Sequence, residues 1–166
     1  MIINKETAYT VDASKKKMKV VREFDAPVDL VWRAWTEPKL LDQWWAPKPW
    51  KANTKSMDFR EGGKWFYYMQ GPDGTRHYCK VEYKSIKPEK SFAGFDGFCD
   101  EEGNTNTEMP GMDWKVVFNQ AGDSTRIEAE ITFASEEDLN KIVEMGFKEG
   151  FAMAHQNLDE LLETLK

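Results

Sequence analysis

The chain has 166 residues, a length that favours a single domain with a sizeable core. Its formal net charge of −6 disfavours a nucleic-acid partner, because nucleic-acid-binding surfaces need clustered basic residues. No segment approaches the roughly 20 apolar residues that span a bilayer, and the N-terminal stretch lacks the apolar core of a secretion signal. We therefore expect a cytoplasmic protein without membrane insertion.

The chain contains two cysteines, Cys79 and Cys99, which we expect to be free thiols in a reducing compartment. Neither belongs to a CxxC pair or a Cys/His pattern, so we predict no metal site. The chain also lacks the GxSxG, HExxH and Walker motifs. No catalytic residue and no cofactor can be assigned from motifs, which leaves enzymatic activity open.

The N-terminal residues 1–17 are predicted to form an arm or a hairpin strand before a single domain of residues 18–166. That domain opens with a strand whose alternation puts four residues on one face: Met18, Val20, Arg22 and Phe24. Arg22 is the exception on this face, because a buried guanidinium needs a carboxylate or a ligand anion. Either the register differs, or Arg22 pairs structurally with an acid, or it anchors an acidic or carbonyl ligand.

Two short amphipathic helices are predicted in the stretch FDAPVDLVWRAWTEPKLLDQWW, residues 24–45. Asp25 is the expected N-cap of the first helix, Pro27 suits its first turn, and Thr36 precedes the second helix. The stretch carries four of the seven tryptophans in the chain. So much aromatic surface must cover either a ligand-sized cavity or a bulky core.

Alternating residues and turn signals predict further strands at residues 53–60, 64–70, 76–86 and 91–96. The inward pair of the second of these is left open between Trp65 with Tyr67 and Phe66 with Tyr68. The third has the clearest alternation in the chain, and its inward face includes His77, Cys79, Val81 and Tyr83.

Residues 97–111 show little apolar periodicity, and a loop of this length is predicted to be a lid or to be disordered. Two more strands follow at residues 113–119 and 125–133, with Trp114 and Phe118 among the inward residues of the first.

The end of the chain, residues 135–165, is predicted to be one long helix capped by Ser135. Its apolar stripe includes Phe147 and Phe151. Gly146 and Gly150 lie four residues apart within it, which indicates close packing, a slight bend, or room for a ligand beside the helix. His155 is expected at the boundary between buried and exposed surface. If it and His77 both pointed inward, they would form a polar end to a cavity.

Three sequence segments support a resemblance to a known family: DAPVDLVWRAWTEPKLLDQWW (residues 25–45), DFREGG (residues 58–63) and MGFKEGFAMAHQNLDELL (residues 145–162). They resemble the activator of Hsp90 ATPase homologue 1-like family of the START-like or SRPBCC superfamily. Two positions depart from the family pattern, His155, where many members have an apolar residue, and Phe151, where tryptophan is common.

The resemblance implies an α+β helix-grip (Bet v 1-like) fold, in which a curved antiparallel sheet wraps around a long C-terminal helix and two short helices follow the first strand. It also implies a cavity between the sheet and that helix. Relatives use the cavity to carry lipids, sterols, hormones or polyketides, and a minority perform chemistry in it. The eukaryotic namesake is a co-chaperone that uses an additional N-terminal domain.

We therefore predict a protein that binds a small apolar or amphipathic ligand, as a monomer or a weak homodimer. One alternative is an enzyme of the cyclase, hydrolase or isomerase sort that uses Arg22, His77 or Tyr83. The other is a chaperone-associated interaction protein. The predicted pocket residues are Arg22, Trp65, Phe66, His77, Val81, Tyr83, Trp114, Phe118, Phe147, Gly150 and Phe151.

Overall fold

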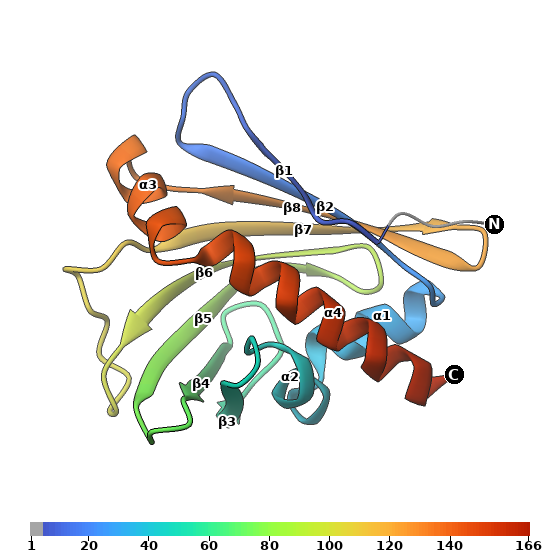
Figure 1. Cartoon of the computed structure of the whole chain (residues 1–166), viewed down its shortest axis with the longest axis horizontal. Helices are drawn as coiled ribbons and strands as arrows, with labels where there is room; N and C mark the ends of the chain where they lie inside the picture. Colours follow the sequence, from blue (N-terminus) through green and yellow to red (C-terminus); the bar gives the residue numbers. More distant parts are fainter. Residues whose placement is uncertain (1–4) are drawn as a thin grey trace.

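The computed structural model describes residues 5–166 as an eight-stranded antiparallel sheet with four helices (Figure 1). The strand order across the sheet is β1-β2-β8-β7-β6-β5-β4-β3. The strands are β1 (Ala8–Val11), β2 (Lys17–Phe24), β3 (Lys51–Met57), β4 (Lys64–Gln70), β5 (Arg76–Lys87), β6 (Ser91–Cys99), β7 (Met112–Ala121) and β8 (Ser124–Thr132).

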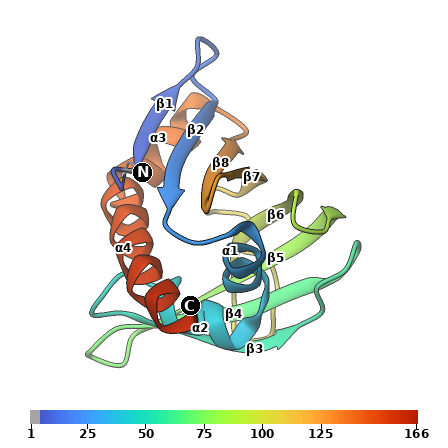
Figure 2. The same cartoon turned by 90° about the vertical axis from the view of Figure 1, so that its right-hand side faces the viewer.

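The sheet curves around the C-terminal helix, which lies on its concave side (Figure 2). Alternation decides which side chains face that helix: Met18 and Phe24 of β2 are fully buried, and Ile131 of β8 lies opposite Met18. The predicted curved antiparallel sheet is confirmed. In the predicted N-terminal segment, β1 pairs with β2 as a hairpin strand, whereas residues 1–4 lie outside the described residues.

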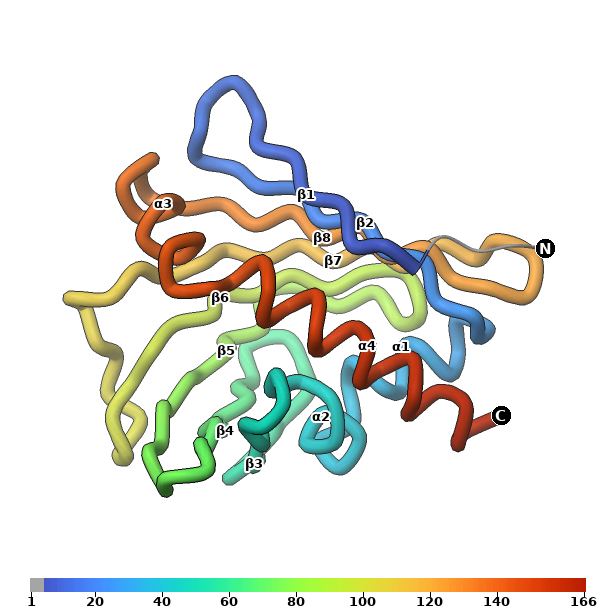
Figure 3. The backbone as a smooth tube through the Cα atoms, in the orientation of Figure 1, coloured from blue at the N-terminus to red at the C-terminus, as the bar shows by residue number. Residues whose placement is uncertain are grey.

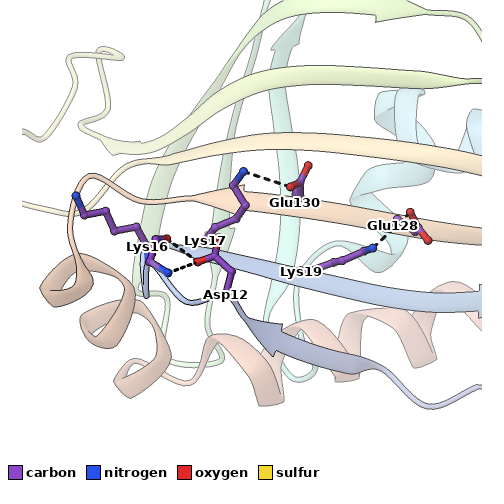
Figure 4. A network of polar contacts seen from close by, with 7 residues as sticks. Asp12, Lys16, Lys17, Lys19, Glu128 and Glu130 are labelled. Atoms are coloured by element: carbon purple, nitrogen blue, oxygen red, sulfur yellow. Dashed lines mark hydrogen bonds and ion pairs between the residues drawn. The ribbon is translucent and has the colours of Figure 1, made fainter.

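The convex face of β2 and β8 carries charged residues of opposite sign (Figure 4). Lys17 contacts Glu130 at 3.3 Å and Lys19 contacts Glu128 at 3.8 Å. All four side chains are at least 30% exposed, so these cross-strand pairs keep the face solvated and each adds roughly 0–1 kcal/mol of stability.

The two short helices are α1 (Val28–Thr36) and α2 (Pro38–Trp44). The predicted cap of α1 is wrong: Pro27 occupies the N-cap position, while the Asp25 carboxylate lies 3.4 Å from Lys166 Nζ. Proline suits this position because it has no N–H to leave unpaired. The rings of Trp35 and Trp44 pack at 5.0 Å, so this pair belongs to the core.

The predicted continuous C-terminal helix is wrong in one respect, because the segment forms two helices, α3 (Glu136–Glu144) and α4 (Phe147–Leu165). Gly146 has a φ of 94°, which other residues rarely adopt, and this left-handed turn separates them. Ser135 caps α3 as predicted, with its side chain accepting the Asp138 N–H at 3.1 Å. The 19 residues of α4 extend about 28 Å at 1.5 Å per residue, which is enough to cross the sheet.

The loop predicted at residues 97–111 is shorter, because β6 continues to Cys99. The backbone trace shows the loop as the yellow connection between β6 and β7 (Figure 3). Its first turn is organised by Asp100, whose carboxylate accepts the backbone N–H groups of Glu102 and Asn104 at 2.9 and 2.8 Å. The strand predicted at 53–60 ends at Met57, because Asp58 and Arg60 form the hydrogen-bonded turn into β4. Cys79 and Cys99 are both free, as predicted.

Candidate ligand pocket

A pocket of about 350 Å³ lies between the start of α4, the segment after α2, and the inner faces of β4, β5, β6 and β7. Seven of the residues around it carry aromatic rings in addition to the imidazole of His77. The lining residues are Trp45, Pro47, Trp50, Tyr67, Met69, His77, Cys79, Asp96, Gly97, Phe98, Met112, Trp114, Ile142, Met145, Gly146, Phe147, Gly150 and Phe151.

The α4 side of the pocket depends on Gly150. A Cβ added there would have Pro47 Cγ as its nearest neighbour, at 3.6 Å, which is ordinary van der Waals contact. Because glycine has no side chain, α4 leaves space for the pocket at this position. Phe147 and Phe151, which are four residues and so about one helical turn apart, place their rings 5.4 Å apart on the same wall.

The segment after α2 is held against both neighbouring elements. Asn157 on α4 donates from its amide nitrogen to the Ala46 carbonyl at 3.1 Å, and Trp45 donates from its indole N–H to the Tyr67 hydroxyl at 3.0 Å. The second bond joins this segment to β4. Because both bonds involve buried groups, they fix the wall that Trp45 and Pro47 form.

Asp96 is the one carboxylate among the residues that line the pocket. It lies on the inner face of β6 in line with Phe92 and Gly94, and only 6% of its surface is exposed. Burial raises the pKa of Asp96 from its usual value to about 7. Within residues 5–166, no hydrogen bond or ion pair is formed by this carboxyl group.

The groups that face Asp96 are Tyr67 on β4 and Cys79 and Tyr83 on β5. Burial raises the pKa of each of these three groups above its usual value. The charge of the nearby Asp96 raises each pKa further. All three are therefore protonated at neutral pH. The indole N–H of Trp114, on β7, is also buried and has no partner among the described residues.

Asp96 is not among the residues predicted for the site, although its sequence carries a signal. Phe92, Gly94 and Asp96 alternate along one face, which places an acid on the apolar side of its strand. The predicted strand ended at residue 96, beside a loop, where a carboxylate is expected to be exposed to solvent. The extension of β6 to Cys99 turns Asp96 from a strand end into an interior residue.

Five of the residues predicted for the site border the pocket: His77, Trp114, Phe147, Gly150 and Phe151. Trp65, Val81 and Tyr83 instead line a second cavity of about 20 Å³, which adjoins the first at Trp45, Asp96 and Trp114. The inward pair of β4 is Trp65 and Tyr67.

Arg22, Phe66 and Phe118 are not part of the pocket. Arg22 turns to the C-terminal half of α4, where Asp159 neutralises it. Phe66 lies on the other face of β4 and packs near Tyr78, because the strand period of two directs it away from Trp65. Phe118 belongs to the core below α1, with its ring 5.0 Å from that of Trp32.

The two histidines do not form a common polar end. His77 is exposed at the pocket rim and stacks on Trp50 at 5.2 Å. His155 is fully buried, contrary to the predicted boundary position, and its Nδ1 lies 2.8 Å from Thr7 Oγ1. Burial, with a smaller effect from Arg22, lowers the pKa of His155 to about 3.

Across residues 5–166 we find no group of three or more His, Cys, Asp or Glu side chains arranged to hold a metal ion. Nor does any helix in this range have both the length and the hydrophobicity needed to cross a membrane.

The sheet closed over α4, with a pocket between them, defines the helix-grip fold. The family model described as activator of Hsp90 ATPase homolog 1-like protein matches residues 25–163. The chain belongs to this family, as the resemblance in its sequence predicted.

Solved structures of similar proteins agree with this assignment. A solution structure from Arthrobacter aurescens is 34% identical, with a TM-score of 0.88 over 95% of this chain and 91% of the other. A crystal structure from Mycobacterium smegmatis is 32% identical, with a TM-score of 0.86 and coverage of 95% and 97%. One from Nitrosomonas europaea is 28% identical, with a TM-score of 0.79 and coverage of 93% and 97%. A search of curated proteins found no match.

Proposed function

We propose that the protein binds a small apolar or amphipathic molecule in the pocket beside α4. The observation that carries this proposal is a space of about 350 Å³ lined mostly by aromatic and aliphatic side chains, with an unpaired carboxyl group at Asp96. Sites for small molecules are typically of this size and character, and a few polar groups fix the orientation of the ligand. Asp96 and the indole N–H of Trp114 are the polar groups suited to that role.

An enzyme of the cyclase, hydrolase or isomerase sort is a second candidate. The supporting observation is the pKa of about 7 for Asp96, because a group with that pKa can accept or donate a proton at neutral pH. In this hypothesis Asp96, and not Arg22, is the charged residue that acts on the substrate, because the Arg22 guanidinium is already paired with Asp159.

A chaperone-associated role is the third candidate, suggested by the family description. Its structural support is small. The large hydrophobic side chains exposed within residues 5–166 are Val11, Met145 and Met153, which come from three separate segments.

The two edge strands of the sheet, β1 and β3, are the candidates for pairing in a weak homodimer.

Native mass spectrometry of protein purified from the organism that encodes it tests the binding role. Gly150→Leu directs a larger side chain toward Pro47 and the pocket, whereas Gly150→Ala adds one methyl group at an ordinary contact distance. We expect the parent and Gly150→Ala to retain the same small molecule and Gly150→Leu to lose it while staying folded by circular dichroism. The same bound mass in folded Gly150→Leu, or no bound mass in any of the three, would contradict the proposal. A mass that the protein converts to another would favour the enzyme.

A further inference from the structure

We propose that the pocket selects an organic cation, a small apolar or aromatic body that carries one positively charged nitrogen, and that Asp96 and the surrounding aromatic rings hold the charge. This inference rests on the proposed function, because it names the chemical class of the ligand that the same pocket binds.

The charge balance of the pocket supports a cation. Asp96 is a potential negative charge, and the lining contains neither lysine nor arginine. The one basic side chain in the lining is His77, which is exposed at the rim and stacks on Trp50. An anionic ligand would bring a second negative charge into a space lined by neither lysine nor arginine. A cationic ligand would supply the partner that the Asp96 carboxyl lacks within the protein.

The aromatic rings supply the second element of cation recognition. Trp114 lies 5.5 Å from Phe151 and 6.1 Å from Trp45, measured between ring centroids, and Trp45 lies 6.1 Å from Phe151. These three rings meet at large interplanar angles of 51° to 89°, so their faces point in different directions around the pocket. A cation over the face of such a ring is attracted by the ring quadrupole, most strongly when water is excluded.

The lining also disfavours a purely apolar ligand. A hydrocarbon would bury the Asp96 carboxyl still further without giving it a partner, which is unfavourable for a charged group. A cation of the same shape keeps the apolar contacts and adds both the ion pair and the ring contacts. The net charge of −6 on the whole chain also favours the approach of cations.

The inference predicts a specific pH dependence. A cation binds best to ionised Asp96, so its affinity should fall as the pH drops below about 7, by as much as tenfold per unit. The other titratable groups facing Asp96 are Tyr67, Cys79 and Tyr83, and raised pKa values keep all three protonated at neutral pH. The pKa of Cys99, three residues further along β6, is also raised. The same pH profile is measured on His77→Gln, which removes the imidazole at the rim of the pocket.

The test compares two molecules of nearly the same shape, phenyltrimethylammonium, which is charged, and tert-butylbenzene, which is neutral. Dissociation constants are measured by NMR titration of the parent, Asp96→Asn and Asp113→Asn. Asp113 is the matched control, because it loses the same charge from the outer face, where it pairs with Lys84 at 2.7 Å. At pH 8 we expect the cation to bind the parent and Asp113→Asn at least tenfold more tightly than its neutral counterpart.

In Asp96→Asn we expect that preference to shrink to less than threefold, and the binding of tert-butylbenzene to stay within about twofold of the parent. The pH profile of the parent provides a check that depends on no variant. Equal or tighter binding of the neutral molecule by the parent at pH 8 would overturn the cation preference and leave the proposed binding role intact. If neither molecule bound, both the inference and the proposed function would fail.

Discussion

Arg22 on β2 and Asp159 on α4 form a bidentate ion pair that joins the sheet to the C-terminal helix. Arg22 Nη1 lies 3.1 Å from Asp159 Oδ1, and Nη2 lies 2.5 Å from Oδ2. The Arg22 side chain is 1% exposed, and that of Asp159 is 20% exposed. The inward arginine that the strand pattern predicted is therefore neutralised within the fold, by a residue in the C-terminal half of α4 that does not line the pocket.

Asp159→Ala should strongly destabilise the protein, because it leaves a buried guanidinium without its counter-charge. We expect a loss of about 2–4 kcal/mol in the free energy of unfolding, measured by urea denaturation. Glu160→Ala is the control: this neighbouring residue pairs with Lys48 in solvent and should contribute less than about 1 kcal/mol. Similar losses in the two variants would show that Arg22 does not depend on Asp159.

His155 should remain neutral over the whole physiological pH range. Its folded-state pKa of about 3 lies below the usual 6.5, so only the unfolded chain takes up a proton as the pH falls from 6.5 toward 3. Stability is therefore lost in that window, by up to roughly 1.4 kcal/mol per pH unit. Imidazole nitrogen NMR should find His155 neutral at pH 5, and a midpoint above pH 6 would contradict its buried position.

Asp96→Asn should be more stable than the parent at high pH. The folded-state pKa of Asp96 is raised from 3.8 to about 7, so the folded protein holds a proton that the unfolded chain releases between these values, and stability falls as the pH rises through this window. The advantage of the variant should grow from near zero at pH 4 to about 2–4 kcal/mol at pH 8. Comparing parent and variant at each pH removes the opposing effect of His155. A constant difference across this range would mean that the carboxyl is solvated.

The two glycines at the start of α4 should respond in opposite ways to alanine. Gly146→Ala forces a side chain into a left-handed conformation at φ 94° and should cost about 1–2 kcal/mol. Gly150 lies within the helix, and an added methyl group would make only ordinary contacts there. Gly150→Ala should therefore raise the free energy of unfolding by up to about 1 kcal/mol through its higher helix propensity. Thermal unfolding of both variants provides the comparison, and destabilisation by Gly150→Ala would indicate that α4 packs more tightly there.

The sequence predicted most of the fold, because strand alternation and helix periodicity are local signals. Met18 and Phe24, for example, face the core as predicted. The break at Gly146 was missed because apolar periodicity continues on both sides of it. The partner of Arg22 lies 137 residues away in the chain, and no local pattern connects the two. The pocket was predicted only in outline, since the curl of the sheet decides which inward residues reach it and sends Phe118 to the core instead.

The central claim, that the pocket beside α4 takes up a small molecule, is tested most directly by NMR of the methionine methyl groups. Met69, Met112 and Met145 line the pocket, on three separate segments. Met18 lies in the core outside the lining, and Met153 is exposed on α4, so both serve as internal controls. During titration with phenyltrimethylammonium at pH 8, the three pocket methyl groups should shift together with one dissociation constant, while the two controls stay in place. Unchanged pocket signals, or equal shifts at all five methionines, would contradict the claim.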